Sequence, residues 1–544
     1  MKSYISTMFA LIIMMTLLLT LTTNAQTAAS ISAADIKEQM QYRIVSFHQG
    51  RADKNLIRRA AELGFNGVQF QLEGNSINSF KDFAERDRKE GYIDLCHKLG
   101  MKVTVWTHEF SAIPGKDKPD YPGTVELGNE KFWKYIEDRY EWILGELVPD
   151  IDGLVLTVVE TQIKATNTDI MLQLVDIIRG KCLKYNKQLI VRTFVWHPED
   201  LEGVMGCVKQ LPEDVVIMTK CVPQDWQLRG IHDKTIGNVG NHTQLVEYDI
   251  AGEYFLMDSA ANCMPSLLKT HFDYGLKHGV DGICLRVDRF NMKILHEPQE
   301  VNLWTLGMLA TGKTDNVEDA WNAWAVARYG RDAAPGVIRA LKPTLQVMTE
   351  CLNIGSFSFG DTRGFPPNPD KDAFLTNWAN FRWDASYLYE YKLGLTGDPG
   401  YTRKIEAQKY NAKRLAQQCL DDLELVKGKL VQADYEILKT KLLSNKVHLE
   451  WRAPIMLAYL HYRRLLSTKD QEEKQQLAQK IQKELKAIVS AAGKIYPPKQ
   501  EIEHLGQKWS VGAPLNFDPK KIVEWTKKME ALVSAQGLTI KLVD

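Results

Sequence analysis

The chain shows two kinds of hydrophobic pattern in alternation from about residue 43 to residue 291. Short apolar runs rich in Val, Ile and Phe predict strands, and segments with apolar residues every three to four positions predict helices. The strands are expected at 43–48, 67–72, 102–106, 153–159, 189–196, 215–220, 244–250 and 282–287. Helices are expected between most of them, at 56–63, 92–99, 132–147, 170–185 and 201–211. Eight such units in about 250 residues predict a (β/α)8 TIM barrel over 40–300, with a doubly wound open sheet as the alternative.

The pattern changes at about residue 300, where the strand signals stop. Long amphipathic segments are expected to be helices at 316–329, 334–353, 372–391, 403–426, 432–466 and 470–491. We therefore predict an α-helical C-terminal domain over 301–544. A strict heptad does not persist, so a coiled coil is the weaker interpretation. Two roles stay open for this domain, which are closing the cleft of the barrel and forming a homodimer.

The first 25 residues have the features of a signal peptide. Lys2 precedes an apolar run from Met8 to Leu21, and small and polar residues follow up to Ala25. The run is short for a membrane span, so an anchor is the weaker alternative. We therefore expect export to the periplasm or the medium, with no stable membrane span after cleavage.

Composition narrows the functional classes. The chain of 544 residues has 68 Lys and Arg against 68 Asp and Glu, and this neutral balance argues against a general nucleic-acid binder. Its eight cysteines are scattered without a CxxC pair, which favours buried free thiols over a disulfide framework, although some pairing stays open. HExxH, P-loop and GxGxxG motifs are missing from the sequence, so we expect neither a metal nor a cofactor.

The barrel prediction directs attention to the carboxyl ends of the strands, where such barrels carry their active sites. Polar residues expected there are His48, Glu73, Asn75, His108, Glu109, Glu160, Arg192, His197, Lys220, Asp225, Glu253, Arg286 and Asp288. Three carboxylates, Glu160, Asp225 and Glu253, follow the fourth, sixth and seventh strands. Because glycoside hydrolysis uses two acidic groups on opposite sides of the scissile bond, this set predicts a glycosidase. Each residue taken singly also has a structural interpretation, as a paired group of the barrel.

Several of these stretches resemble a known family. Residues 220–227 read Lys-Cys-Val-Pro-Gln-Asp-Trp-Gln and resemble the sixth-strand motif of the α-glucuronidases of glycoside hydrolase family 67. Residues 247–254, 191–196, 65–68 and 302–310 resemble further motifs of that family, in the same order along the chain. The resemblance extends from about residue 56 to residue 330. It departs from the family at Leu156, where the family has a Lys, and in lacking the β-sandwich domain that precedes the family's barrel.

The resemblance implies roles for individual residues. It places Asp225 and Glu253 as the pair that activates the hydrolytic water, and Glu160 as the general acid, which implies an inverting reaction. It also implies that Arg192 and Lys220 face the carboxylate of a uronic-acid substrate. Pairing with a barrel acid is the alternative for both cations.

Aromatic residues near the predicted strand ends are candidates for stacking on sugar rings. We expect Trp196 and Trp226 to contact the carbohydrate, together with His108. Trp106 is a further candidate for stacking, and core packing is the alternative for all three tryptophans. The expected function is thus an exported α-glucuronidase-like glycoside hydrolase. A glycosidase for another sugar, with inversion or retention, and a non-catalytic glycan-binding barrel are the alternatives.

Overall fold

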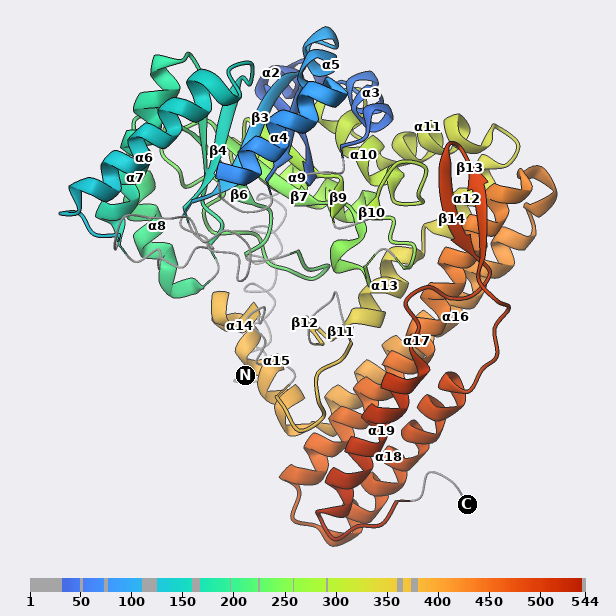
Figure 1. Ribbon diagram of the computed structural model, residues 1–544. Helices are drawn as coiled ribbons and strands as arrows, with labels where there is room; N and C mark the ends of the chain where they lie inside the picture. Colours follow the sequence, from blue (N-terminus) through green and yellow to red (C-terminus); the bar gives the residue numbers. More distant parts are fainter. Residues whose placement is uncertain are drawn as a thin grey trace, which may run out of the picture.

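The computed structural model describes residues 32–48, 52–72, 77–109, 125–158, 167–195, 197–223, 226–257, 259–289, 292–359, 365–372 and 380–540. Figure 1 shows two parts, with the barrel in blue to green and an elongated bundle of helices in orange to red that projects from it. The predicted signal peptide lies outside the described residues.

Eight parallel strands form a closed barrel in which every strand pairs with its sequence neighbours and β1 pairs with β8. The strands are β1 (Tyr42–His48), β2 (Gly67–Gln71), β3 (Lys102–His108), β4 (Gly153–Thr157), β5 (Gln188–Arg192), β6 (Val216–Lys220), β7 (Gln244–Asp249) and β8 (Gly282–Arg286). Ile44 of β1 lies opposite Gly67 on one side and Cys284 on the other. This closure confirms the predicted barrel and excludes the open doubly wound sheet.

Side chains alternate between the interior of the barrel and the surrounding helices, as the period of a strand requires. An interior cluster contains Ile44, Trp106, Val155, Ile190, Val216, Met218, Leu245 and Cys284. Their neighbours along the strands, such as Val45, Val105 and Leu156, belong to the larger core that includes the helices. This alternation places Arg192, Lys220, Glu247, Asp249 and Arg286 toward the interior at the carboxyl ends of their strands.

Helices follow most strands. They are α3 (Lys54–Glu62), α4 (Ile77–Glu90), α5 (Tyr92–Lys98), α6 (Glu130–Trp142) with the π-helical turn η1 (Ile143–Leu147), α7 (Thr168–Lys184), α8 (Leu201–Val208), α9 (Pro265–Lys277) and α10 (Glu300–Ala310), with α2 (Ala33–Gln39) before β1. The connection from β6 to β7 departs from the expected repeat, because its described residues form turns and no helix. A short hairpin, β9 (Asp288–Arg289) and β10 (Met292–Lys293), precedes α10.

The remaining helices make up the helical region, whose later members form the elongated bundle of Figure 1. They are α11 (Val317–Tyr329), α12 (Ala334–Leu341), α13 (Thr344–Leu352), α14 (Asn380–Trp383), α15 (Leu388–Thr396), α16 (Pro399–Glu424), α17 (Gln432–Ser467), α18 (Gln471–Ala492) and α19 (Pro519–Ser534). The helix predicted over 334–353 is two helices, because Pro343 lacks the amide hydrogen that a continuous helix needs. Part of the helix predicted over 372–391 lies outside the described residues, and its described part is interrupted by a 3₁₀ turn.

The bundle also carries strands, so the expectation that strand signals end at residue 300 was wrong. A hairpin pairs β13 (Gln500–His504) with β14 (Gln507–Val511), and a two-residue pair joins β11 (Asn353–Ile354) to β12 (Phe357–Ser358). The hairpin packs Ile502, Trp509 and Val511 against Ile437 of α17.

The bundle is attached to the loops that follow the last three barrel strands. After β6, Arg229 Nη2 lies 2.6 Å from Glu350 Oε1 of α13. After β7, the backbone nitrogen of Ala261 donates to Asn445 Oδ1 of α17 at 2.9 Å. After β8, Glu297 pairs with Lys441 of α17 at 2.8 Å. The helical region therefore lies on the side of the barrel where its strands end.

Two general features complete the fold. All eight cysteines are buried free thiols, which confirms the preferred interpretation of their spacing. Among the described residues, no helix is long and apolar enough to cross a membrane.

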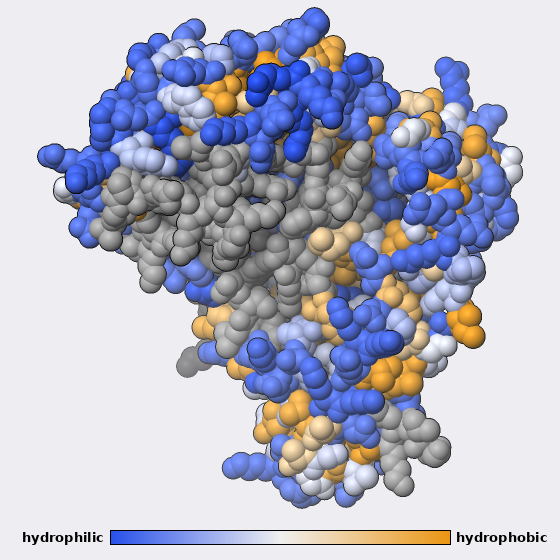
Figure 2. Space-filling view, in the orientation of Figure 1, coloured by the Kyte–Doolittle hydropathy of each residue, from blue (hydrophilic) through white to orange (hydrophobic). Residues whose placement is uncertain are grey.

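The described surface in Figure 2 is mainly hydrophilic over the barrel, and orange hydrophobic groups gather on the helical region. That region exposes Tyr389, Tyr410, Leu425 and Ile495, each by at least 73%, and homodimerisation through it stays a prediction.

Candidate functional site

The structure describes five of the eight residues expected at the site. Glu160, Asp225 and Trp196 lie outside the described residues, so their roles stay predictions. The other five are His108, Arg192, Lys220, Trp226 and Glu253. Arg192, Lys220 and Glu253 meet in one cluster of charged side chains at the carboxyl ends of β5 to β8.

Arg192 ends β5 and is 1% exposed. Its Nε and Nη2 donate to Glu247 Oε2 and Oε1 at 2.6 and 2.9 Å, a two-pronged contact that fits the planar guanidinium. The guanidinium also lies 4.5 Å from the ring centre of Trp106 and 4.4 Å from that of Phe194. Arg192 is thus held by a carboxylate and by two aromatic rings.

Lys220 and Arg286 extend the cluster. Lys220 Nζ lies 2.9 Å from Asp249 Oδ2 and 4.0 Å from Glu247 Oε1. Arg286 Nη1 lies 3.1 Å from Asp249 Oδ1 and 3.8 Å from Glu247 Oε1. Three cations therefore share two carboxylates of β7, and we call these five residues, with Glu253, the mouth cluster.

Burial and the neighbouring cations shift the pKa values of Glu247 and Asp249 in opposite directions. Burial by itself would raise the pKa of Glu247, but the neighbouring Arg192, Lys220 and Arg286 outweigh it, and the pKa of Glu247 is lowered. The pKa of Asp249 is lowered for the same reason, with Lys220 and Arg286 as the main opposing charges. Both carboxylates are consequently ionised at neutral pH, and the cluster is held together by charge.

Glu253 lies in a short 3₁₀ turn, η3 (Gly252–Tyr254), that follows β7. Its side chain is buried, and Oε2 lies 3.5 Å from Arg286 Nη2. Since Arg286 also contacts Asp249, the predicted catalytic carboxylate is connected to the mouth cluster through one guanidinium. This position, after the seventh strand and beside the interior of the barrel, is the one in which a barrel enzyme carries its reacting groups.

The two described ring residues differ in their surroundings. His108 ends β3, is partly exposed, and its ring centre lies 4.9 Å from that of Trp106, so it borders the mouth cluster. Trp226 is fully buried and packs against His271 and Tyr248 at 5.5 and 6.4 Å. Tyr248 belongs to the core shared with the helices, so this geometry favours the core-packing alternative for Trp226.

Glu247 and Asp249 were not among the candidate residues drawn from the sequence. A signal for them was present, because the strand reads Gln-Leu-Val-Glu-Tyr-Asp and alternation places Leu245, Glu247 and Asp249 on one face.

Leu156, where the sequence departs from the family, belongs to the core on the helix side, so its side chain is directed away from the barrel interior. The next residue, Thr157, accepts a hydrogen bond from Trp106 Nε1 at 2.7 Å.

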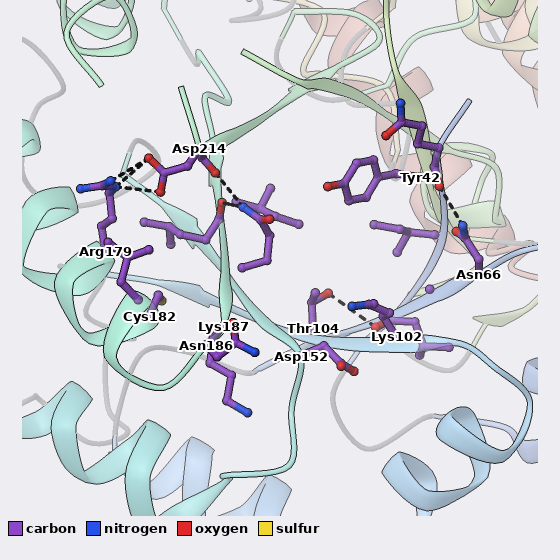
Figure 3. A pocket seen from close by; sticks show the side chains of 18 residues that line it. Tyr42, Asn66, Lys102, Thr104, Asp152, Arg179, Cys182, Asn186, Lys187 and Asp214 are labelled. Atoms are coloured by element: carbon purple, nitrogen blue, oxygen red, sulfur yellow. Dashed lines mark hydrogen bonds and ion pairs between the residues drawn. The ribbon is translucent and has the colours of Figure 1, made fainter. Parts of the chain in front are cut away.

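A cavity of about 530 Å³ lies at the end of the barrel opposite the mouth cluster, and Figure 3 shows the side chains that line it. Lys102, Thr104, Asp152 and Asp214 are among the residues that line it, and Arg179 binds Asp214 through Nε and Nη2 at 2.9 and 2.7 Å. The amino ends of barrel strands serve stability, whereas the carboxyl ends carry the chemistry. We therefore assign the candidate active site to the mouth cluster.

Comparisons with known proteins extend the fold assignment. No protein-family model and no curated protein sequence matches the chain. Among solved structures, the chain is similar to a GH138 enzyme targeting pectin rhamnogalacturonan II, with a TM-score of 0.62 and 11% identity over 92% of this chain and 85% of that one. An O-GlcNAc hydrolase from Thermobaculum terrenum aligns with a TM-score of 0.43 and 12% identity over 84% of this chain and 96% of that one. At 11% identity the first likeness establishes a shared fold, which extends over the barrel and most of the helical region.

Proposed function

We propose that the chain is a glycoside hydrolase that cleaves a uronic-acid-bearing linkage at the carboxyl end of its barrel. The observation that carries this proposal is the mouth cluster, where three buried cations meet the carboxylates of Glu247, Asp249 and Glu253. Burying charges costs free energy that an apolar interior would avoid, so such a cluster in a barrel mouth is more typical of a functional site than of a structural one. The fold shared with a glycoside hydrolase supports the same assignment.

The catalytic roles in this proposal come from the resemblance to family 67. Glu160 protonates the leaving oxygen, and Asp225 with Glu253 activates a water molecule on the other face of the sugar. Inversion needs the acid and the base about 6.5–9.5 Å apart, with room for that water. Support within the described residues comes from Glu253, which is buried at the strand ends beside Arg286.

Recognition of a uronate is assigned to Arg192 and Lys220. Both are buried cations at the mouth, and a substrate carboxylate would compete for them with Glu247 and Asp249. This internal pairing is the observation that favours the second candidate, a glycosidase for a neutral sugar, in which the cations only hold the two barrel acids. A non-catalytic glycan-binding barrel is the third.

Export belongs to the same proposal. The predicted signal peptide over residues 1–25 would deliver the mature chain, starting near Gln26, to the periplasm or the medium. Such a location suits an enzyme that degrades polysaccharide. The structural neighbour is described as targeting a pectin, which makes pectic oligosaccharides reasonable substrates to try beside glucuronate-bearing xylan fragments.

A panel of aryl α- and β-glycosides, each as the uronide and as its neutral counterpart, tests the proposal. We expect cleavage of one uronide, with the inverted anomer as the first product seen by NMR. The variant Arg192→Met should raise KM sharply for the uronide and much less for its neutral counterpart. Equal rates on both members of a pair would support the neutral-sugar candidate, and binding without cleavage of any glycan would support the non-catalytic one.

A further inference from the structure

Arg286 ends β8, next to the strand whose loop carries Glu253. It pairs in register with Asp249, the last residue of β7. The carbonyl oxygen of Arg286 accepts hydrogen bonds from the backbone nitrogens of Ile250 and Ala251, both at 3.3 Å. The backbone of Arg286 therefore holds the segment that leads from β7 to Glu253.

The side chain of Arg286 joins the acids at the two ends of that segment. Nη1 lies 3.1 Å from Asp249 Oδ1, and Nη2 lies 3.5 Å from Glu253 Oε2. Both nitrogens belong to one planar group, so the guanidinium restrains how these two carboxylates lie relative to each other. Trp106, in the interior of the barrel, has its ring centre 5.7 Å from the guanidinium carbon. Arg286 thus connects the end of β7 to the loop residue that is predicted to act as a base.

This connection is buried and charged. The side chain of Arg286 is 7% exposed, and those of Asp249 and Glu253 are 4% and 3% exposed. Burial by itself would lower the pKa of Arg286, but Asp249 and Glu253, as the main opposing charges, outweigh it, and the pKa is raised. Buried charges of opposite sign are screened little by salt, so the contact keeps its strength under ordinary assay conditions.

The loop is also held after Glu253, from the helical region. Asn516 Nδ2 donates to the carbonyl oxygens of Leu256 at 3.2 Å and Met257 at 3.5 Å. Leu256 and Met257 have φ values of 57° and 54°, a backbone conformation that residues other than Gly rarely adopt. The backbone is therefore fixed on both sides of Glu253. The remaining freedom of its carboxylate lies in the side-chain torsions, which the contact with Arg286 restricts.

We propose that Arg286 is a positioning residue, which holds the Glu253 carboxylate in the orientation that activates the hydrolytic water. A general base must lie within hydrogen-bond reach of the proton that it removes, and a misplacement of about 1 Å can cost about 100-fold in rate. The guanidinium suits this task because its fork contacts Asp249 and Glu253 together, whereas an ammonium group is a single point charge. The inference rests on the proposed function, in which Glu253 is part of the base.

Arg286→Lys tests the inference, because it keeps the positive charge and removes the fork. We expect the ammonium group to pair with Asp249, the closer of the two acids, and to release Glu253. The kcat should fall by about 10-fold on the aryl uronide and equally on its neutral counterpart, with KM nearly unchanged. This factor is the lower end of what a hydrogen bond to a charged group is worth, because 3.5 Å is a long contact.

Arg328→Lys is the matched control. Arg328 also forks onto a buried carboxylate, with Nη1 and Nη2 at 3.1 and 2.6 Å from Asp434, but it lies in α11 of the helical region. Its kcat and KM should equal those of the wild type. A loss in Arg286→Lys on the uronide alone, with a raised KM, would make Arg286 a substrate-binding residue. That result, an unchanged kcat, or an equal loss in the control would overturn the inference and leave the proposed function standing.

Crystal structures of the wild type and of Arg286→Lys decide the matter if no glycoside is cleaved, because the position of a carboxylate does not depend on turnover. In the wild type we expect Glu253 within hydrogen-bond distance of Arg286. In the variant we expect the Glu253 side chain in a different rotamer, with the new ammonium group on Asp249. An unmoved Glu253 carboxylate in the variant would contradict positioning by Arg286 even though the proposed function had failed on other grounds.

Discussion

Replacing Glu247 by Gln tests whether charge holds the barrel mouth together. Glu247 is fully buried and bonds Arg192 at 2.6 and 2.9 Å, with Arg286 and Lys220 at 3.8 and 4.0 Å. At an effective dielectric constant of about 20, each charge about 4 Å away contributes roughly 4 kcal/mol of gross attraction, which the cost of burying the carboxylate partly offsets. The net loss on breaking a buried ion pair is about 3–5 kcal/mol. We expect Glu247→Gln to lower the free energy of unfolding by that amount.

Urea unfolding followed by circular dichroism and tryptophan fluorescence measures the effect, with Glu137→Gln as the control. Glu137 pairs with Lys181 at 2.9 Å at the surface, and its loss should cost under about 1 kcal/mol. The double variant Arg192→Met with Glu247→Met should recover most of the stability. It removes one charge of each sign and leaves Lys220 and Arg286 facing Asp249 and Glu253. A loss in Glu247→Gln no larger than in the control would refute the charge-based account of the mouth.

Three further predictions follow from described residues. The pKa values of Glu247 and Asp249 are lowered on folding, so their ionised carboxylates stabilise the folded protein above the unfolded pKa values of about 4. This stabilisation is lost as the pH falls through the folded pKa values. The urea concentration at the unfolding midpoint should therefore decrease when the pH is lowered below about 4, and it should decrease less in Glu247→Gln. Asn516→Ala removes the two bonds that hold the loop after Glu253, and should lower kcat by about 3- to 10-fold with KM nearly unchanged; a change in KM alone would argue against positioning. The melting temperature should fall as well, because Asn516 has a φ of 53°, a left-handed conformation that Ala adopts less readily. Thiol titration should find eight cysteines in urea and none reacting rapidly in the native protein, since burial raises the pKa of thiols such as Cys96 and Cys182 to about 12; fewer than eight in urea would indicate a disulfide.

The barrel could be predicted closely because its signals are local. Each observed strand begins within one residue of its predicted start, since short apolar runs and glycines mark the boundaries. The hairpin of β13 and β14 was missed although Ile502, Trp509 and Val511 alternate with polar residues. Its turn uses Leu505 and Gly506 at φ values of 52° and 70°, and a Leu in this conformation carries none of the usual Asn-Gly signal.

The mouth cluster shows the limit of sequence reasoning. Arg192 and Lys220 were expected at the strand ends, and the structure describes both there. Their partners were not predictable, because Arg192 and Glu247 are 55 positions apart and meet only when β5, β6 and β7 lie side by side. A buried acid within an apolar strand is visible in the sequence, but which cation it neutralises depends on the register of three strands.

The location of the active site is tested most directly by kcat/KM of Glu253→Gln on the aryl uronide that the wild type cleaves best. The account predicts a loss of about 100- to 10,000-fold, the scale of a missing general base, in a variant that is still folded by circular dichroism. Lys102→Ala, at the cavity on the opposite end of the barrel, should retain wild-type turnover and serves as the control. Near-wild-type turnover in Glu253→Gln would contradict the account, because the mouth cluster would then lack its catalytic carboxylate.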